Sequence, residues 1–376
     1  MSTLSAWSKR VIVARPGRVC LVLGVVAVAV AGTLCSGIGT RPATAASATT
    51  KSAAAGHFEV STVEELRDAL AKLPGSGGVI QLRAGDYILD QPLEISGRHS
   101  VTLAGDGWTC RIIRRGAGHA ISFSDAGFCE IRHILIEGDN AAASGSALVL
   151  RGNCSSCTVD HCRIVNFPES GVRFEGDPQH PMSSNTIRDC HLIGNLGDQL
   201  FSQNNNDFYI VGNQFGTHRG NPRTGCVLDH SSAGSYSLNY HWGNQVALRM
   251  GPAANYNRIE NNRFEECRES ALVIGSESGD DWNAFHIITG NTFHTNSQAK
   301  PGEFAAVVAH HAHDITFCQN QIFRWDSTKY RHKHSLVINA NCSQWIVKDN
   351  HFRHNTGEAL VTHSNSGMLI KDNLTD

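Results

Sequence analysis

The sequence predicts an all-β protein, a right-handed parallel β-helix solenoid of about nine to eleven coils with an N-terminal α-helical cap. Three observations predict it: a repeated apolar–Asn–apolar unit, a short alternating strand after most of these units, and an amphipathic helix before the first unit. Pro is scarce, with 10 residues in 376, and only 18% of residues are charged, which favours a turn-rich β protein over a helical or disordered chain.

The repeated unit is an apolar residue, then usually an Asn three positions later, then another apolar residue two positions after that. The copies begin 21 to 30 residues apart, a period typical of solenoid proteins. Asn side chains at equivalent turns would stack about 4.8 Å apart and hydrogen-bond along the stack, so we expect them to be structural. The predicted copies begin at Ile131, Val159, Ile187, Ile210, Leu238, Ile259, Ile288, Phe317, Val347 and Ile370.

Short alternating segments follow these copies, for example residues 171–174, 225–228 and 271–274. A helical repeat would need ten or more residues with a 3.6-residue period, and the coils contain no such segment. Residues 61–73 predict a short helix with a capping box from Ser61 to Glu64. We expect this helix to cover the open end of the stack, because an uncovered β edge invites aggregation.

The N-terminal segment predicts export. Four Lys and Arg residues precede an apolar run at residues 19–34, and small residues follow, so residues 1–45 are interpreted as a signal peptide. The run is shorter than the roughly 20 residues that span a bilayer, and an uncleaved anchor is the alternative. Residues 46–57 predict a flexible spacer before a β-helix domain at residues 58–376. We therefore expect a secreted or periplasmic protein with no membrane contact after signal removal.

Cysteines recur at equivalent positions of neighbouring coils. Cys129 and Cys157 both lie two residues before the start of a repeat, and Cys162 and Cys190 both lie three residues after one. Such positions are about 4.8 Å apart, within the roughly 4.4 to 6.8 Å that a disulfide spans. Disulfides are admissible in an exported protein, and reduced thiols that fill the core are the alternative.

Outward-facing residues of neighbouring coils predict a ligand groove. Strand alternation places Glu175, Asp229 and Arg249 near one line on the outside, with Asp198 at a strand start between them. The loops around these coils are rich in charged and aromatic residues. The predicted catalytic residues are Asp229, Arg249, Glu265 and Glu266. The predicted substrate-binding residues are Glu175, Asp198, His230, His241, Trp242, Arg268 and Trp282.

These residue types fit chemistry on sugars. Carboxylates about 5 to 10 Å apart could act as acid, base or nucleophile at a glycosidic bond. A His or Arg could instead abstract the C5 proton of a uronate or neutralise its carboxylate. Aromatic rings such as that of Trp242 would stack on sugar rings. The net charge of −2 argues against nucleic acid as a partner, because phosphate binding needs a concentrated basic face.

Metal binding has weaker support. Residues 310–313 carry three His, and His363 takes the equivalent strand end two coils later, but solvent-exposed turn histidines explain this pattern. A zinc site that combines Cys154 and Cys157 with His161 and Cys162 would need ligands that strand alternation points in different directions. We predict no metal ligand and no firm cofactor, and Ca²⁺ remains the one considered.

The segments "GGVIQLRAGDYIL", "NRIENNRF" and "ESALVI" resemble the pectate-lyase-like right-handed β-helix superfamily over residues 58–376. The resemblance implies a scaffold shared by lyases, glycoside hydrolases, uronan epimerases, fructan-processing transferases and phage spikes. It implies a secreted carbohydrate-active enzyme, a lyase or glycoside hydrolase, acting on an extracellular polysaccharide. A fructan-type transferase or hydrolase with paired carboxylates, and a non-catalytic glycan-binding or envelope protein, are the alternatives. A homotrimer is also compatible with the resemblance.

Overall fold

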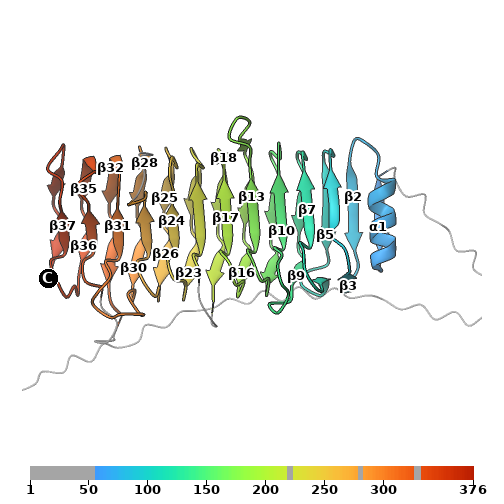
Figure 1. Ribbon diagram of the computed structural model, residues 1–376, viewed down its shortest axis with the longest axis horizontal. Coiled ribbons are helices and arrows are strands. Elements are labelled where there is room, and N and C mark those ends of the chain that lie inside the picture. Colours follow the sequence, from blue (N-terminus) through green and yellow to red (C-terminus); the bar gives the residue numbers. More distant parts are fainter. Residues whose placement is uncertain (1–55, 218–222, 278–282, 326–331) are drawn as a thin grey trace, which may run out of the picture. The chain divides into compact units, whose positions relative to one another are not determined.

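The structure, a computed structural model, describes residues 56–217, 223–277, 283–325 and 332–376. The predicted signal peptide and nearly all of the predicted spacer lie outside these residues. Short parallel strands pair from coil to coil into three long sheets, which we call A, B and C (Figure 1). From β2 (Gly78–Leu82) onward each coil adds a strand to sheet A, one to sheet B and, except in the last coil, one to sheet C; one coil adds a second short strand to sheet A. The predicted parallel β-helix is confirmed.

The twelve strands of sheet B correspond to about twelve coils, slightly more than predicted, because the coils before Ile131 lack the Asn signal. Sheet A contains β1 (His57–Val60), β2 (Gly78–Leu82), β5 (Val101–Gly105), β8 (Glu130–Arg132), β11 (Thr158–Asp160), β15 (Thr186–Arg188), β19 (Tyr209–Val211), β22 (Ser235–Ser237), β25 (Arg258–Glu260), β28 (Asn283–Ala284), β29 (Ile287–Thr289), β32 (Ala312–Cys318), β35 (Ser343–Lys348) and β38 (Leu369–Lys371).

Sheet B contains β3 (Gly85–Leu89), β6 (Cys110–Arg114), β9 (Leu135–Glu137), β12 (Arg163–Val165), β16 (His191–Ile193), β20 (Gln214–Gly216), β23 (Tyr240–Trp242), β26 (Arg263–Glu265), β30 (Thr292–His294), β33 (Gln321–Phe323), β36 (His351–Phe352) and β39 (Leu374–Thr375). Sheet C contains β4 (Leu93–Ser96), β7 (Ile121–Ser124), β10 (Leu148–Arg151), β13 (Val172–Glu175), β17 (Leu200–Gln203), β21 (Cys226–Asp229), β24 (Leu248–Met250), β27 (Leu272–Ile274), β31 (Val307–Ala309), β34 (Leu336–Ile338) and β37 (Leu360–Thr362). Strands β14 (Met182–Ser183) and β18 (Asn205–Asn206) form a small separate pair.

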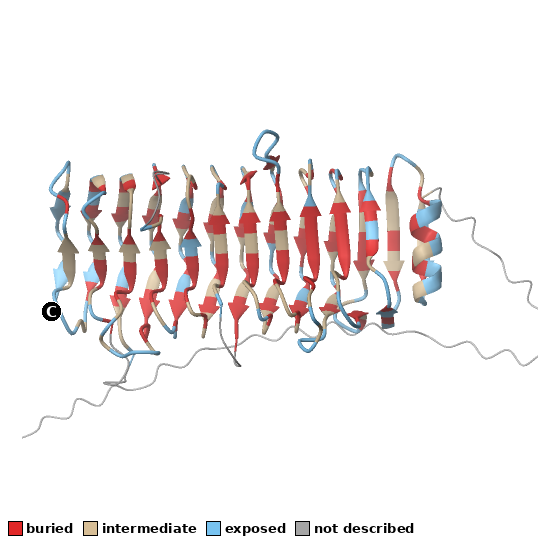
Figure 2. Cartoon of the chain, in the orientation of Figure 1, coloured by how far each residue is buried: buried red, intermediate tan, exposed pale blue. Residues whose placement is uncertain are grey.

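Alternation along each strand produces the core. In β21, Cys226 and Leu228 are buried while Val227 and Asp229 are partly exposed, and the same pattern recurs through the stack (Figure 2). In-register pairing then stacks apolar side chains on apolar side chains: Leu228 pairs with Met250, which pairs with Ile274. The outer faces of the sheets therefore carry the side chains available to a ligand.

Buried asparagines connect the coils between sheets A and B. Asn262 Nδ2 donates to Asn291 Oδ1 at 3.0 Å, and Asn291 Nδ2 donates to Asn320 Oδ1 at 3.0 Å. Each also donates to a backbone carbonyl of the preceding coil, as Asn291 does to Ile259 at 2.8 Å. These amides pair with the backbone N–H and C=O groups at the corner, where the backbone leaves the sheet.

One copy of the repeat lies elsewhere than predicted. Leu238, the predicted start of the irregular copy, is 63% exposed and has a φ of 57°. Tyr236 instead pairs with Ile210 and Ile259, so the copy is Tyr236, Asn239 and His241. A search for aliphatic residues missed it because a Tyr and a His occupy the two apolar positions.

Helix α1 (Val63–Lys72) precedes the first coil and buries Leu66, Ala69 and Leu70 (Figures 1 and 2). Its N-cap is Thr62, one residue later than predicted, because Thr62 keeps an extended backbone and its Oγ1 accepts from Glu65 N at 3.2 Å. Glu65 reaches back to Ser61 N at 2.6 Å. Among the described residues, no helix is both long and apolar enough to cross a membrane.

The ten cysteines within the described residues are free thiols. Of the two alternatives, disulfides or reduced thiols that fill the core, the structure has the reduced thiols. A hydrogen bond from the Cys157 thiol lowers the pKa of Cys129 to about 7, against the opposing effect of burial.

Candidate functional site

The outer face of sheet C carries two columns of side chains. Register pairing connects equivalent positions of neighbouring coils, so these residues are stacked about 4.8 Å apart. One column contains Arg151, Glu175, Gln203 and Asp229. The other contains Arg173, Phe201, Val227 and Arg249. Glu175 and Asp229 therefore share one column, while Arg249, which was predicted near the same line, lies in the other column of this face.

Glu175 is held by two arginines. Arg151 Nε and Arg173 Nε each lie 2.7 Å from one of its carboxylate oxygens. Burial raises the pKa of Glu175, but these two hydrogen bonds outweigh burial and leave its pKa lowered. Both oxygens are occupied, so the residue is a structural ion-pair centre at this end of the face.

Asp229 lies two coils further along the same column. Gln203 Nε2 donates to its Oδ2 at 2.8 Å, and His230 Nδ1 lies 2.7 Å from its Oδ1. His230 occupies a left-handed backbone position, with a φ of 48°, immediately after the strand. The arrangement presents an amide, a carboxylate and an imidazole together at the end of β21.

A pocket of about 390 Å³ opens on the same face, beginning at Arg249. Arg249 is exposed and forms no ion pair among the described residues. His310 Nε2 lies 3.7 Å from Oε1 of Glu277, whose side chain is 84% exposed. The lining comprises Arg249, Ser270, Val273, Gly275, Ser276, Glu277, Phe304, Val308 and His310.

The protonation of His310 is set by its surroundings. Burial lowers its pKa; Glu277 opposes this effect, while His311 and Arg249 add to it, and the net pKa is lowered. Asn339 Nδ2 lies 3.0 Å from His310 Nδ1, so Nδ1 accepts and the neutral ring carries its proton on Nε2. The pocket thus combines a cation, a neutral hydrogen-bond donor and a carboxylate.

Glu265 lies on a different sheet from Asp229 and Arg249, and Glu266 lies just beyond the end of its strand. Glu265 ends β26 on sheet B, and the chain turns a corner before it enters sheet C at β27. Glu265 is 8% exposed, with Tyr240 Oη at 2.5 Å and His294 Nε2 at 2.8 Å, and Arg263 also pairs with it. Glu266 is exposed in the following turn. The four predicted catalytic residues therefore do not form one group.

The prediction that His241 binds substrate is wrong. It is 0% exposed and lies in the core between the rings of Phe215 and Phe264, with centroids 4.7 and 5.2 Å away. Tyr236 Oη hydrogen-bonds to its Nε2 at 2.5 Å. Burial lowers the pKa of His241 to about 3. A fully buried neutral ring in this position cannot contact a polymer.

The remaining predicted binding residues are dispersed. Trp242 lies outward on sheet B, where its ring covers Gly216. Asp198 precedes β17 and accepts from Thr224 N at 3.2 Å; burial raises its pKa. Arg268 is exposed in the turn after β26, and Trp282 lies outside the described residues.

The sequence analysis noted the His310 cluster without selecting it, and it selected neither Glu277 nor Asn339. A signal for two of them existed. His310 and Asn339 follow β31 and β34 in the column that contains Asp229, and His310 N donates to Ile274 O as Asn339 N donates to Ala309 O. Extending the Asp229 column through the later coils would have identified both.

One trio of side chains has the spacing of a metal site. Ligand atoms of His133, Asp160 and His161 lie within 4.8 Å of one another. However, Arg188 contacts both oxygens of Asp160 at 3.1 and 3.2 Å, and His161 Nδ1 lies 2.6 Å from one of them. The carboxylate is already neutralised by an arginine, so the trio is an ion-pair cluster.

Comparison with known proteins agrees with this geometry. Residues 146–322 match the family model for a right-handed β-helix region. The chain has the fold of a right-handed β-helix. The structural neighbours of this β-helix protein are pectate-lyase-like β-helix proteins, while no curated protein sequence matches it.

Three solved structures illustrate the likeness. The A-module of a mannuronan C-5 epimerase from Azotobacter vinelandii is 13% identical, with a TM-score of 0.59 and coverage of 84% of this chain and 95% of that one. An alginate lyase from Paenibacillus sp. FPU-7 is 14% identical, with a TM-score of 0.57 and coverage of 72% and 99%. The Dettilon tailspike protein is 11% identical, with a TM-score of 0.52 and coverage of 83% of this chain and only 64% of the tailspike. At these identities the likeness concerns the fold.

Proposed function

We propose that this β-helix protein cleaves an acidic extracellular polysaccharide by β-elimination in the sheet C pocket. The observation that carries the proposal is the exposed guanidinium of Arg249, which has no carboxylate partner among the described residues and shares a pocket with neutral His310 and with Glu277. An unpaired arginine in a pocket is suited to bind a carboxylate of the ligand. Structural neighbours that are named alginate lyase and mannuronan epimerase support a uronate-containing substrate.

Arg249 and His310 would bind the uronate carboxylate together. The guanidinium offers two parallel N–H donors, and His310 offers Nε2–H because Asn339 occupies its Nδ1. When the proton on C5 of the uronate leaves, negative charge moves onto that carboxylate. Fixed donors aimed at this charge stabilise the transition state more than the ground state.

Glu277 would accept the C5 proton, because it is the carboxylate of the pocket and lies 3.7 Å from the His310 donor. The C5–H electrons form the C4=C5 double bond as the C4–O4 bond breaks. The protonated Glu277 then returns its proton to the departing O4. No water is consumed, and the products are an unsaturated uronate and a new chain end.

Asp229, with Gln203 and His230, would bind the adjacent part of the chain. Asp229 and His230 lie on the coil before Arg249 and Gln203 lies one coil earlier, so an oligosaccharide lying along the stack would meet both sets. The carboxylate and the amide can hydrogen-bond to sugar hydroxyls. Hydrolysis by paired carboxylates has less support, because Glu265 lies on sheet B, Glu266 lies in the turn after it, and Glu175 is neutralised by two arginines.

The deciding experiment offers alginate, polygalacturonate, chondroitin and inulin to the purified protein. β-Elimination predicts ultraviolet absorbance from the C4=C5 bond on a uronate polymer and none on inulin. Arg249→Ala and Glu277→Gln should abolish the absorbance, while Arg258→Ala, an exposed arginine on sheet A, should retain it. New reducing ends without absorbance would replace the proposal with hydrolysis, and no turnover on any glycan would replace it with a binding protein.

Export remains part of the proposal. A polymer substrate would be met outside the cell, and residues 1–45 have the charge and apolar pattern of a signal peptide. N-terminal sequencing of protein from the culture medium should find a start near Ala46. Retention of the full chain in the cell would contradict this part.

A further inference from the structure

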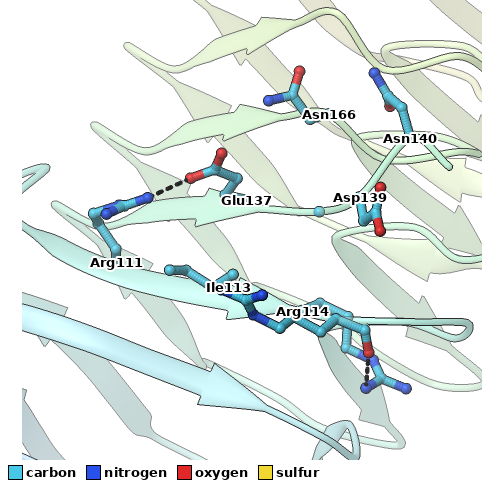
Figure 3. Close-up of a pocket in the computed structure, with 9 residues that line it drawn as sticks. Arg111, Ile113, Arg114, Glu137, Asp139, Asn140 and Asn166 are labelled. Carbon is cyan, nitrogen blue, oxygen red and sulfur yellow. Dashed lines mark hydrogen bonds and ion pairs between the residues drawn. The ribbon is translucent and has the colours of Figure 1, made fainter. Parts of the chain in front are cut away.

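The outer face of sheet B contains a second polar groove, near the N-terminal coils and on a different sheet from the Arg249 pocket. Two adjoining pockets of about 400 and 290 Å³ form it, and both are lined by Asn140 and Asn166. In Figure 3, Asn140 and Asn166 lie on one side of Glu137 and Ile113 lies on the other. We call the combined feature the sheet B groove.

The floor of the sheet B groove is apolar. Ile113, Val165 and Ile193 occupy one outward column of β6, β12 and β16, and Glu137 of β9 lies between the first two. The four coils extend over three steps of the stack, about 14 Å. Asn140 extends over the groove, where its Nδ2 lies 3.4 Å from the carbonyl oxygen of Gly194. An apolar floor with amides at the rim suits the ring faces and hydroxyls of a short oligosaccharide.

The balance of charge in the sheet B groove is positive. Arg111 pairs with Glu137 at 2.9 Å, as the dashed line in Figure 3 marks, and Arg114 is buried with its Nη1 on the carbonyls of Leu89 and Asp90. Arg115 and Arg163 remain exposed, and neither forms an ion pair among the described residues.

Asp139 is the remaining carboxylate of the lining. Its Oδ1 accepts from Ala141 N at 2.9 Å within its own loop. Four arginines therefore line the groove against two carboxylates, and one of those carboxylates is already paired. The groove favours an anionic ligand over a neutral or cationic one.

An aromatic residue extends the groove at the Arg163 end. The guanidinium of Arg163 lies 5.6 Å from the ring centroid of Trp108, which is 41% exposed. Trp108 is fixed by a 3.2 Å hydrogen bond from Nε1 to the carbonyl oxygen of His161 and by an edge contact with His191. A rigid, half-exposed indole beside an arginine is suited to bind a sugar ring next to a carboxylate.

We propose that the sheet B groove is a second binding site, for an acidic oligosaccharide. It would bind the polymer at a place separate from the Arg249 pocket. Arg163 and Arg115 would bind uronate carboxylates, Trp108 would stack on a sugar ring, and Asn140 and Asn166 would contact hydroxyls. The inference does not depend on β-elimination, because the groove would bind the polymer whether or not the sheet C pocket cleaves it.

Binding is best measured by calorimetry with polygalacturonate oligosaccharides as the probe. The full chain carries Arg249→Ala throughout, so that neither cleavage nor the sheet C cation contributes. Adding Arg163→Ala or Trp108→Ala should each weaken binding about tenfold, a loss of about 1.4 kcal/mol. Arg258→Ala, an exposed arginine on sheet A, is the matched control and should leave the affinity unchanged. Melting temperatures verify that each variant is folded.

Outcomes separate this proposal from the proposed function. Loss of all binding in Arg249→Ala alone would overturn the sheet B groove, since the polymer would then be held only on sheet C. Unchanged affinity in both folded groove variants would overturn it as well. Equal affinity for neutral xylan oligosaccharides would refute recognition by charge. Binding that Arg163→Ala weakens supports the groove even if no polymer is cleaved.

Discussion

Asn339 and His310 are neighbours through the stack, with Asn339 Nδ2 3.0 Å from His310 Nδ1 and also 3.0 Å from the carbonyl oxygen of Ala309. Because an amide nitrogen only donates, His310 must accept through Nδ1. The Nε2–H of its neutral ring therefore faces Glu277 and the pocket. A residue one coil later thus decides what His310 can offer a ligand.

Asn339→Asp should reverse this arrangement. A carboxylate in place of the amide accepts Nδ1–H, so the neutral ring loses the proton on Nε2, and the pKa of His310, which burial lowers in the native protein, should rise. The variant keeps an Nε2–H only while His310 is protonated. Its kcat/KM relative to the native protein should therefore fall as pH rises through the new pKa, as measured by pH profiles. Asn341→Asp, on the same turn but next to His311, is the control; parallel profiles for all three proteins would contradict the proposed role.

Arg249 should be needed for turnover of a uronate polymer. Arg249→Ala removes the cation from the pocket and should lower kcat/KM by on the order of 100-fold or more. Arg249→Lys retains the charge but not the paired N–H donors, and should recover only part of the loss. Initial rates by ultraviolet absorbance measure both. Full activity in Arg249→Lys would show that charge alone suffices and that no bidentate contact is made.

His241→Phe should make the protein less sensitive to acid. The pKa of His241 is about 3 in the fold and near 6.5 in the unfolded chain, so the unfolded state binds more protons below pH 6.5. Stability is therefore complete above about pH 6.5 and falls by about 1.4 kcal/mol per pH unit as pH drops toward 3. Phe continues the stack with Phe215 and Phe264 and cannot be protonated.

The difference in stability between the native protein and His241→Phe should change sign across the pH range. Near pH 7.5 the variant should be about 1 kcal/mol less stable, because Tyr236 Oη loses its partner. Near pH 4.5 it should be the more stable protein. Urea unfolding at several pH values measures the crossover, and curves that stay parallel would show that His241 is not protonated on unfolding.

Asn291→Ala should destabilise the stack strongly. Its Oδ1 accepts from Asn262 N and Nδ2, and its Nδ2 donates to Asn320 and Ile259. The substitution leaves several of these buried partners unsatisfied, at a cost of about 3 kcal/mol. Thermal unfolding should show a clear drop in Tm, with exposed Asn341→Ala nearly unchanged. A small effect would mean that water replaces the amide at this corner.

The sequence alone determined the path of those coils that carry the full apolar–Asn–apolar unit. The spacing of Ile259, Asn262 and Phe264 assigns the first to sheet A, the second to the corner and the third to sheet B. Strand alternation then decides which side chains face out. Such features depend on local geometry, which a repeated pattern reports. The same reasoning predicted that Asp229 and Arg249 share a face. It failed at His241 because a His there occupies a position where Phe is usual.

The grouping of side chains into pockets was decided by the tertiary structure. Arg249, Glu277 and His310 come from successive coils, and their approach depends on the order in which coils stack and on which corner separates two sheets. Glu265 is only 16 residues from Arg249 in sequence and His310 is 61 residues away, yet Glu265 lies on sheet B while His310 lines the pocket with Arg249. The position of a residue within its coil decides which sheet or corner it occupies, and the order of the coils decides how far apart two residues are along the stack. Only the folded chain shows both.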